Sequence, residues 1–255
     1  MRTDTSPSPT GDPSVIRAIG FAHELANGLA SIRLNLYFAL EELKDNAVHN
    51  AALEALLRAA LAEAHIQFIE AINLVSVFHP ELVASLDRPE RLVVSPSAVL
   101  QEVLPMYVHR AANRGIEFHV EGLGTGLPKQ RLDVSVLRRV FHNVLSNAVK
   151  YSFGPAAGGQ RFIRIQELRP DALQPWWVMR IENYGVGVTQ DEVRKIFIPG
   201  YRGILARGDN IHGAGIGLGE AKRCMESLGG RFRLQSKQVN ADAFRTSVSL
   251  VFRSE

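Results

Sequence analysis

Two stripes of apolar residues run through the first third of the chain. In each stripe, apolar positions recur at spacings of three and four, which is the period of one face of an α-helix. The first stripe comprises Val15, Ile19, Ala22, Leu25, Leu29, Ile32, Leu36, Leu40 and Leu43, and the second comprises Leu53, Leu57, Ala60, Ala64, Phe68, Ile72 and Val75. The polar segment KDNAVHN separates them, and Pro80 ends the second. The pattern therefore predicts two helices that fold back as an antiparallel hairpin.

A two-helix hairpin buries little apolar surface on its own. Both stripes are narrow, as in the seam of a coiled coil or a four-helix bundle. We therefore expect residues 14–80 to pair with the same hairpin of a second copy, which makes the chain a homodimer. Residues 1–13 are rich in Ser, Thr, Pro and Gly and are predicted to be a disordered lead-in.

The pattern changes after Pro80. A polar linker at about 81–95 leads into segments with alternating helical and strand-like periods, so residues 81–255 are predicted to form one α+β domain. Helices are expected at 97–113, at 134–152 after the candidate N-cap Asp133, at 189–197 and at 216–228. Strands are expected at 116–120, 161–168, 176–183, 231–237 and 245–252.

Composition narrows the class of protein. Of the 255 residues, 46% are hydrophobic, which is enough for a buried core. The single cysteine, Cys224, excludes an intramolecular disulfide and favours a reducing compartment, so we expect the cytoplasm. The most apolar region is interrupted by charges such as Glu63 and Glu70, and the N-terminus lacks the apolar core of a signal peptide, so no membrane span is expected. The net charge is only +3 and its basic residues are scattered, so no nucleic-acid partner is expected.

The segment HNVLSNAVKYS holds the first candidate site. In a helix, Asn143, Asn147 and Lys150 are spaced four and three apart, so their side chains share one face. Mg2+ prefers oxygen ligands, and a lysine ammonium neutralises the phosphates that complete its coordination shell. The same triplet also fits the polar, solvent-facing side of an ordinary helix.

Two glycine-rich segments follow. In ENYGVGV, directly after a predicted strand, Gly185 and Gly187 allow positive φ and a close approach of the backbone to a flat ligand, although a plain turn explains them as well. In HGAGIGLGEAKRCMESLGG, Gly213, Gly215 and Gly217 precede an apolar helix whose N-terminus can hold phosphate oxygens. Neither the dinucleotide-binding fingerprint nor a Walker loop fits this spacing.

Taken in order, these motifs resemble the GHKL-type ATPase domain of sensor histidine kinases. NVLSNAVKYS resembles the family's N box, NYGVGV its first glycine box, IFIPGYRG its F box and GAGIGLGEAKR…LGG its second glycine box. HELANGLASI resembles the H box of the helical hairpin, with Ala26 and Gly28 at the positions of the usual basic residue and proline. The resemblance spans roughly residues 14–252. It implies an all-α helical hairpin, paired in a dimeric four-helix bundle, followed by an α+β GHKL-type ATPase sandwich.

The resemblance implies three roles in the hairpin. His23 is the implied phosphoacceptor, although a lone histidine here also fits a partly buried bundle residue. Glu24 is the adjacent carboxylate that takes or stabilises the proton of the imidazole. Asn27, one helical turn after His23, is placed to hold a water for phosphatase activity on a phosphorylated partner.

The resemblance also implies ATP and Mg2+ as cofactors. Asn147 is the implied Mg2+ ligand, supported by Asn143, while Lys150 neutralises phosphates and Tyr151 packs beside the nucleotide. The glycines at 213, 215 and 217 close over the triphosphate as a lid. The family's first glycine box normally opens with an aspartate that accepts a hydrogen bond from the adenine amino group. Asn183 stands in its place, and its carboxamide oxygen can still accept that bond.

The implied function is that of a two-component histidine protein kinase. Such a protein phosphorylates His23 from ATP and passes the phosphoryl group to an aspartate on a response-regulator receiver domain, with a separate sensor or input protein as a further expected partner. Two alternatives stay open. One is a catalytically silent phosphotransfer or adaptor dimer with a degenerate ATPase-like domain, and the other is a GHKL serine kinase.

Overall fold

A computed structural model describes residues 51–78, 91–124, 127–152, 161–169, 176–208, 214–241 and 243–253, together with single helical positions between 32 and 41. The helices are α2 (Ala51–Phe78), α4 (Pro96–Ala112), α5 (Val134–Tyr151), α6 (Ile204–Gly208) and α7 (Gly217–Ser227), with short 3-10 turns η1 (Gln190–Glu192) and η2 (Lys195–Phe197). The strands are β1 (Arg91–Val94), β2 (Glu117–Glu121), β3 (Gln130–Asp133), β4 (Phe162–Leu168), β5 (Trp176–Gly185), β6 (Arg231–Gln238) and β7 (Phe244–Arg253).

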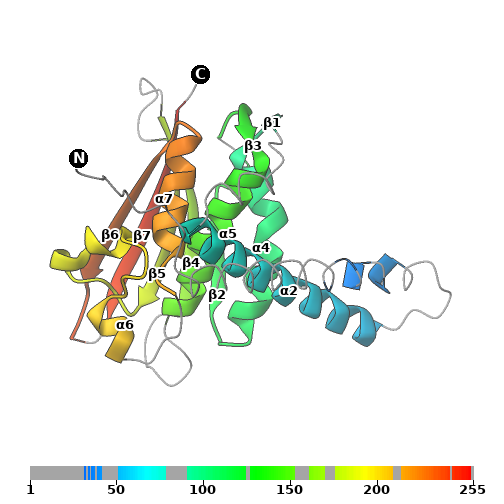
Figure 1. Ribbon diagram of the computed structural model, residues 1–255, viewed down its shortest axis with the longest axis horizontal. Helices are drawn as coiled ribbons and strands as arrows, with labels where there is room; N and C mark the ends of the chain where they lie inside the picture. Colours follow the sequence, from blue (N-terminus) through cyan, green and yellow to red (C-terminus); the bar gives the residue numbers. More distant parts are fainter. Residues whose placement is uncertain are drawn as a thin grey trace, which may run out of the picture.

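Five of the strands form one mixed sheet. Its order is β2-β4-β5-β7-β6, with β2 parallel to β4 and the other neighbours antiparallel. Helices α4, α5 and α7 lie side by side on one face of this sheet, and the small antiparallel pair β1-β3 lies at one end of the helical layer (Figure 1). The chain therefore builds a two-layer α+β sandwich, which confirms the fold class expected for its C-terminal part.

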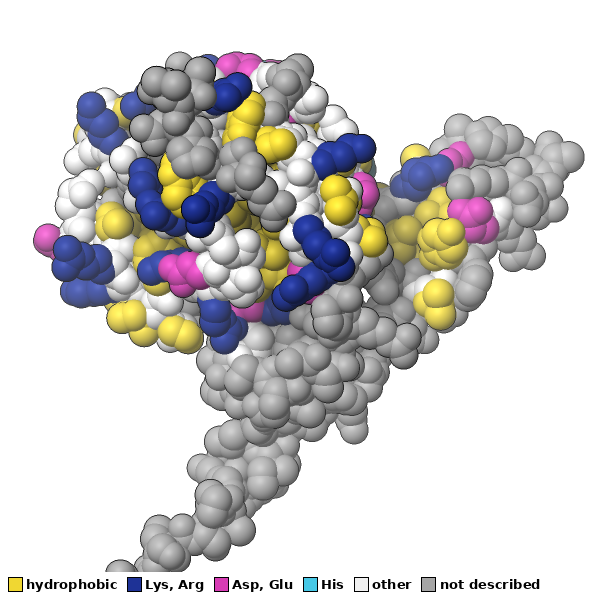
Figure 2. Space-filling view, turned by 90° about the horizontal axis from the view of Figure 1, so that it is seen from above, with side chains coloured by type: hydrophobic (Ala, Val, Ile, Leu, Met, Phe, Trp, Pro, Cys, Tyr) yellow, Lys and Arg dark blue, Asp and Glu magenta, His cyan; other side chains and the backbone are white. Residues whose placement is uncertain are grey.

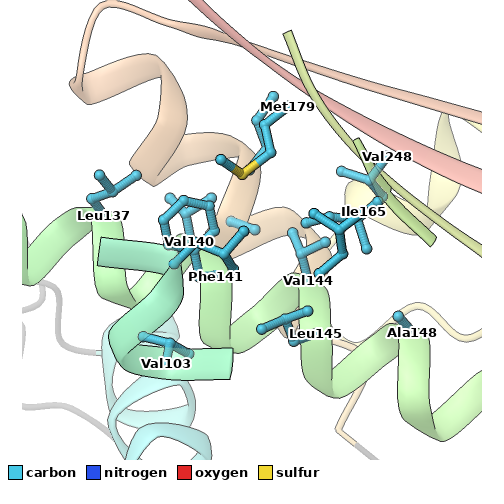
Figure 3. Packing of buried hydrophobic residues seen from close by; sticks show 14 of the residues in the cluster. Val103, Leu137, Val140, Phe141, Val144, Leu145, Ala148, Ile165, Met179 and Val248 are labelled. Carbon is cyan, nitrogen blue, oxygen red and sulfur yellow. The ribbon is translucent and has the colours of Figure 1, made fainter. Parts of the chain in front are cut away.

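The core lies between the helical layer and the sheet. Figure 3 shows α5 side chains such as Val140 and Val144 facing Ile165 of β4, Met179 of β5 and Val248 of β7. These side chains are buried. Burying one such aliphatic side chain contributes roughly 1.5–3 kcal/mol. The core therefore fixes one side of α5 against the central strands. The opposite side of α5 is left for other contacts.

Local sequence explains where α5 begins and ends. The carboxylate of Asp133 accepts hydrogen bonds from the backbone N–H groups of Ser135 and Val136, at 3.1 and 3.3 Å, as predicted for an N-cap. At the other end, Arg114 donates to the backbone oxygens of Val149, Lys150 and Ser152. These carbonyls belong to the last turn, which has no helical partners for them.

The second helix of the predicted hairpin is confirmed as α2. Its C-terminal half packs against α4, α5 and α7, and its N-terminal half extends away from the sandwich (Figure 1). Leu53 and Leu56 on that extending half are exposed. The described positions between 32 and 41 are helical, and the remainder of the first predicted helix lies outside the described residues.

Some expectations differ from the structure in detail. The helix expected at 189–197 is two 3-10 turns, because the carboxylate of Glu192 turns inward and accepts hydrogen bonds from Tyr201 Oη and Ile204 N, both at 2.8 Å. Strands β1 and β3 and the short helix α6 were not anticipated. Within the described part of the chain, no helix combines the length and apolar character that a membrane crossing requires.

The surface shows no single charged patch on the face seen in Figure 2. Lys and Arg side chains lie scattered over the rounded sandwich, interspersed with polar and apolar groups. This scatter matches the distribution of basic residues along the sequence.

Candidate functional site

A cavity opens beside α5, on the helix side that the core leaves free. It is lined by the C-terminal half of α5, by β5 with the turn after it, by Ile196 of η2, by the segment leading into α6, by the N-terminus of α7, and by β6 and β7. Helix α2 adds Glu70 and Asn73 to the lining. The cavity therefore lies where the motifs singled out in the sequence come together in space.

Three polar side chains of α5 share this cavity. Asn143, Asn147 and Lys150 all line it, as their spacing predicts for one helix face. Nδ2 of Asn147 donates to the backbone oxygen of Asn143 at 2.9 Å. That bond uses the amide nitrogen, so the side-chain oxygen Oδ1 is the atom that Asn147 offers to a ligand.

Asn143 is held from the opposite side by α2. Nδ2 of Asn73 donates to Oδ1 of Asn143 at 2.6 Å, and both side chains are buried. Ser146, which also lines the cavity, has its hydroxyl 3.5 Å from a carboxylate oxygen of Glu70. No pattern in the sequence indicates that α2 contributes to this cavity.

Lys150 and Tyr151 occupy the C-terminal end of α5. Both line the cavity and are half-buried, and Lys150 Nζ lies 5.9 Å from the centre of the Tyr151 ring. Burial lowers the pKa of Lys150, an effect that the Glu70 carboxylate opposes and that Arg202 reinforces. Burial raises the pKa of Tyr151. Arg114 holds the backbone of this last turn, so it positions both side chains.

The glycines before α7 are required by close packing. Gly215 has φ +70°, and a Cβ there would lie 2.5 Å from the backbone oxygen of Tyr201. A Cβ on Gly217 would lie 3.1 Å from Oδ1 of Asn143 and 3.5 Å from Nδ2 of Asn147. The N-terminus of α7 therefore sits directly over the polar face of α5, where its free N–H groups favour an anion.

The glycines after β5 are also required by close packing. Gly185 and Gly187 are not among the described glycines with positive φ, so neither uses that part of a glycine's conformational freedom. A Cβ on Gly185 would lie 1.9 Å from the backbone oxygen of Tyr151, and one on Gly187 would lie 2.2 Å from Phe244. Packing between the end of β5, the end of α5 and β7 therefore requires glycine at both positions. Gly187 also lines the cavity.

The part of the cavity lined by β5, β6 and β7, which we call its apolar end, is mainly apolar. Ile181, Val188, Leu234 and Val248 line it, and Asn183 of β5 is the buried carboxamide among them. Its neighbour Glu182 points to the opposite face of the sheet, where Arg245 lies 3.8 Å from its carboxylate. A flat, apolar ligand fits this end, while the other end offers amides and an ammonium.

Glu192 organises the segment that closes the cavity beside α6. Its buried carboxylate accepts hydrogen bonds from Thr189 Oγ1, Tyr201 Oη and Ile204 N at 2.7 to 2.8 Å. Burial alone would raise the pKa of Glu192, but these hydrogen bonds outweigh burial and lower it. Sequence reasoning missed Glu192, and a buried glutamate beside a glycine-rich segment leaves no local pattern by which to find it.

The cavity suits a Mg2+ ion only together with a ligand. Among the described residues, no group of three or more His, Cys, Asp or Glu side chains could hold a metal. The side-chain oxygen of Asn147 is the protein ligand that this end offers, and Mg2+ commonly takes one or two protein oxygens together with phosphates and water. The residues therefore fit Mg2+ that arrives with phosphates.

Four of the expected site residues lie outside the described residues. They are His23, Glu24 and Asn27 of the hairpin and Gly213 of the glycine-rich segment. The structure thus brings together Asn143, Asn147, Lys150, Tyr151, Asn183, Gly187, Gly215 and Gly217 around one cavity.

Comparisons with known proteins agree with this arrangement. ArcB of Escherichia coli, an aerobic respiration control sensor protein, is 27% identical over 189 residues, which cover 71% of this chain and 23% of ArcB. MprB of Mycobacterium leprae, a signal transduction histidine-protein kinase/phosphatase, is 25% identical over 228 residues, which cover 89% of this chain and 40% of MprB. The chain therefore spans less than half the length of these curated relatives.

One solved structure has a fold similar to that of this chain, and one family model matches its C-terminal part. The structure of full-length ShkA in complex with AMPPNP is similar with a TM-score of 0.52 at 22% identity, over 91% of this chain and 46% of ShkA. Residues 132–254 match the family described as histidine kinase-, DNA gyrase B- and HSP90-like ATPase. Residues 132–254 of this chain therefore form a GHKL-type ATPase domain, and the chain is similar in sequence to sensor histidine kinases.

Proposed function

We propose that the chain is the core of an ATP-dependent protein-histidine kinase that phosphorylates His23 and transfers the phosphoryl group to an aspartate of a response-regulator receiver domain. The observation that supports this most is the two-ended cavity. One end offers amides, an ammonium and the N-terminus of α7, and the other is apolar with one buried carboxamide. These are the chemistries of a triphosphate and of a nucleobase.

Each residue of the polar end has a role in this proposal. Oδ1 of Asn147 holds Mg2+, and Asn143 supports Asn147 through its backbone oxygen. Lys150 neutralises phosphate charge, and the backbone at Gly215 and Gly217 lies over the phosphates. Mg2+ held by Asn147 would supply positive charge that offsets the charge of the phosphates.

The transfer itself is assigned to the hairpin. A neutral imidazole nitrogen of His23 forms a bond to the γ-phosphorus while the bond from that phosphorus to the β,γ-bridging oxygen breaks, and ADP leaves. Glu24 takes or stabilises the proton on the other ring nitrogen. Asn27 orients a water toward a phosphoryl group on the partner aspartate, which adds phosphatase activity.

The proposal includes a homodimer. Apolar side chains on the described parts of both hairpin helices are exposed in a single chain: Ile32, Leu34, Tyr37, Leu53 and Leu56. Leu56 is 68% exposed, which is unfavourable for a helix that stays unpaired. A four-helix bundle made by two copies covers such a face.

The test is phosphorylation with ATP labelled at the γ-phosphate. We expect label on the purified protein that is labile in acid and stable in alkali, lost in His23→Gln, and reduced at least tenfold in Asn147→Ala. Label retained by His23→Gln with acid stability would indicate a serine kinase instead. A protein that binds ATP, gives no label and accepts a phosphoryl group from a phosphorylated receiver domain would be the silent adaptor.

A further inference from the structure

Asn183 carries a polar atom, Nδ2, that the described structure leaves unused. Its side chain is 6% exposed and lines the apolar end of the cavity. Nδ2 of Asn183 is buried and has no hydrogen-bond partner among the described residues. A buried amide donor without a partner costs roughly 1–3 kcal/mol, so the position is unfavourable unless a ligand supplies an acceptor.

The other polar groups nearby are already engaged. Thr246, opposite Asn183 in the β5-β7 register, has its hydroxyl 3.1 Å from the hydroxyl of Ser236. Ser236 Oγ also accepts the backbone N–H of Val188 at 3.0 Å. The carboxamide of Asn183 is thus the side chain available to recognise a ligand at this end.

The carboxylate side chains near the cavity lie away from its apolar end. Of the described residues that line the cavity, Glu70 alone is acidic, and it lies near Ser146 and Lys150 at the polar end. Glu182 lies on the opposite face of the sheet. The apolar end therefore presents a neutral group with one acceptor and two donors, rather than a charged group that only accepts.

We propose, on the basis of the nucleotide-binding function above, that Asn183 recognises the 1,6 edge of a purine with both halves of its carboxamide, so that the site binds 6-oxopurine nucleotides as well as adenine nucleotides. With adenine, Oδ1 accepts from the 6-amino group and Nδ2 donates to N1. With hypoxanthine, the amide is turned over, so Nδ2 donates to O6 and Oδ1 accepts from N1–H. Each base satisfies both halves of the side chain.

A carboxylate at position 183 would not behave in this way. Both of its oxygens accept, so it pairs with the one donor that each base offers on this edge, the 6-amino group of adenine or N1–H of hypoxanthine, and places negative charge against the acceptor beside it. A buried site that opposes a polar group of its ligand in this way loses affinity. Asn183→Asp is therefore a nearly isosteric substitution that removes the donor needed for either purine.

The experiment is titration calorimetry of the full chain with MgADP, MgIDP and MgCDP. ADP and IDP differ only at positions 1 and 6 of the base, and CDP carries a smaller base whose amino group and N3 lie nearer the ribose, so it reports binding without the purine 1,6 edge. We expect the wild-type Kd for IDP to lie within about tenfold of that for ADP, with CDP at least about tenfold weaker than both. In Asn183→Asp, binding of ADP and of IDP should each weaken by about tenfold or more, toward the affinity of CDP.

Other outcomes overturn the inference in distinguishable ways. A wild-type preference for ADP over IDP of more than about 100-fold refutes it and leaves the proposed kinase intact. Equal binding of CDP, ADP and IDP refutes it because the base is then not recognised. Binding of no nucleotide at all refutes the proposed function as well. The wild-type comparison needs no variant, so it holds even if Asn183→Asp folds poorly.

Discussion

Nδ2 of Asn73 in α2 lies 2.6 Å from Oδ1 of Asn143 in α5, and this buried hydrogen bond joins the hairpin helix to the nucleotide cavity. Glu70, one turn earlier in α2, lines the same cavity. A ligand that needs the side chain of Asn143 must therefore compete with α2. The position of the hairpin and the occupancy of the cavity are coupled through this contact.

The first prediction concerns that coupling. Asn73→Ala removes a donor that holds Asn143, so we expect Mg-nucleotide affinity to rise by about three- to tenfold, which corresponds to about 1 kcal/mol for one hydrogen bond. Leu74→Ala, at the exposed neighbouring position, is the matched control and should leave affinity unchanged. Calorimetric titration with MgADP measures both. Weaker binding in Asn73→Ala would mean that α2 supports the site rather than competing for it.

The second prediction concerns the packing of α7 on α5. Glu220 of α7 is buried and pairs with Arg139 of α5 and with Arg223, and the side chains of Glu220 and Arg139 are 3% and 8% exposed. Glu220→Gln removes the buried carboxylate with which Arg139 pairs, so we expect a loss of about 3 kcal/mol in the free energy of unfolding. Urea denaturation measures this loss.

A matched control for that variant lies on the same helix. Glu226 is exposed and lies 3.9 Å from Lys222 in a surface ion pair, so Glu226→Gln should change stability by less than about 0.5 kcal/mol. Equal effects of the two substitutions would show that the buried pair does not hold α7 to α5.

The third prediction is a loss of stability in acid that His142 causes. His142 Nε2 lies 3.0 Å from Nε2 of His65, and its Nδ1 lies 3.1 Å from the hydroxyl of Tyr107. Because that hydroxyl donates to the backbone oxygen of His142, Nδ1 carries the proton and Nε2 accepts from His65. Burial, with smaller effects of His65 and Arg138, lowers the pKa of His142 to about 3.

The sign of the pH dependence follows from that pKa. The unfolded chain takes up this proton near pH 6.5 and the folded chain only near pH 3, so stability is full above pH 6.5 and falls as the pH drops. The contribution of His142 to the slope is about 1.4 kcal/mol per pH unit. Urea denaturation between pH 7 and pH 4.5 should show a shallower slope in His142→Gln than in the wild type. Parallel slopes would contradict the prediction, and the exposed His119→Gln should leave the slope unchanged.

The fourth prediction concerns Lys150 in alkali. Burial lowers its pKa from the ordinary 10.5, and phosphate binding requires the charged ammonium. Nucleotide affinity should therefore fall as the pH rises through this lowered pKa, by up to about tenfold per pH unit. Lys150→Arg keeps its charge, so its affinity should stay level over the same range. A fall of equal size in both proteins would assign the effect to another group.

Local patterns were sufficient to predict most of the elements. The apolar period of α2, the N-cap at Asp133 and the alternation of β4 to β7 are properties of neighbouring residues, and the structure confirms them. The spacing that places Asn143, Asn147 and Lys150 on one helix face is likewise local. Roles that the resemblance implies for these residues stay predictions until nucleotide binding is measured.

Contacts between distant segments could not be predicted in this way. Arg114 binds the end of α5 from 36 positions away, and Asn73 reaches Asn143 from 70 positions away. No sequence period encodes such pairs. The two glycines after β5 show the same limit, because glycine at 185 leaves room for the backbone of Tyr151, which belongs to a distant segment. The sequence shows which residues stand at these positions, but only the packing between elements explains why those residue types are needed there.

The strand order has a consequence for the order of synthesis. Strand β7 is the last strand in the described chain, yet it lies between β5 and β6 in the sheet, and its Thr246 and Val248 line the cavity. While the chain is being made from its N-terminus, β5 keeps an open edge and the cavity lacks part of its wall until β7 emerges. An open edge of this kind invites pairing with other chains. Nucleotide can therefore stabilise the finished domain but cannot protect a chain interrupted before β7.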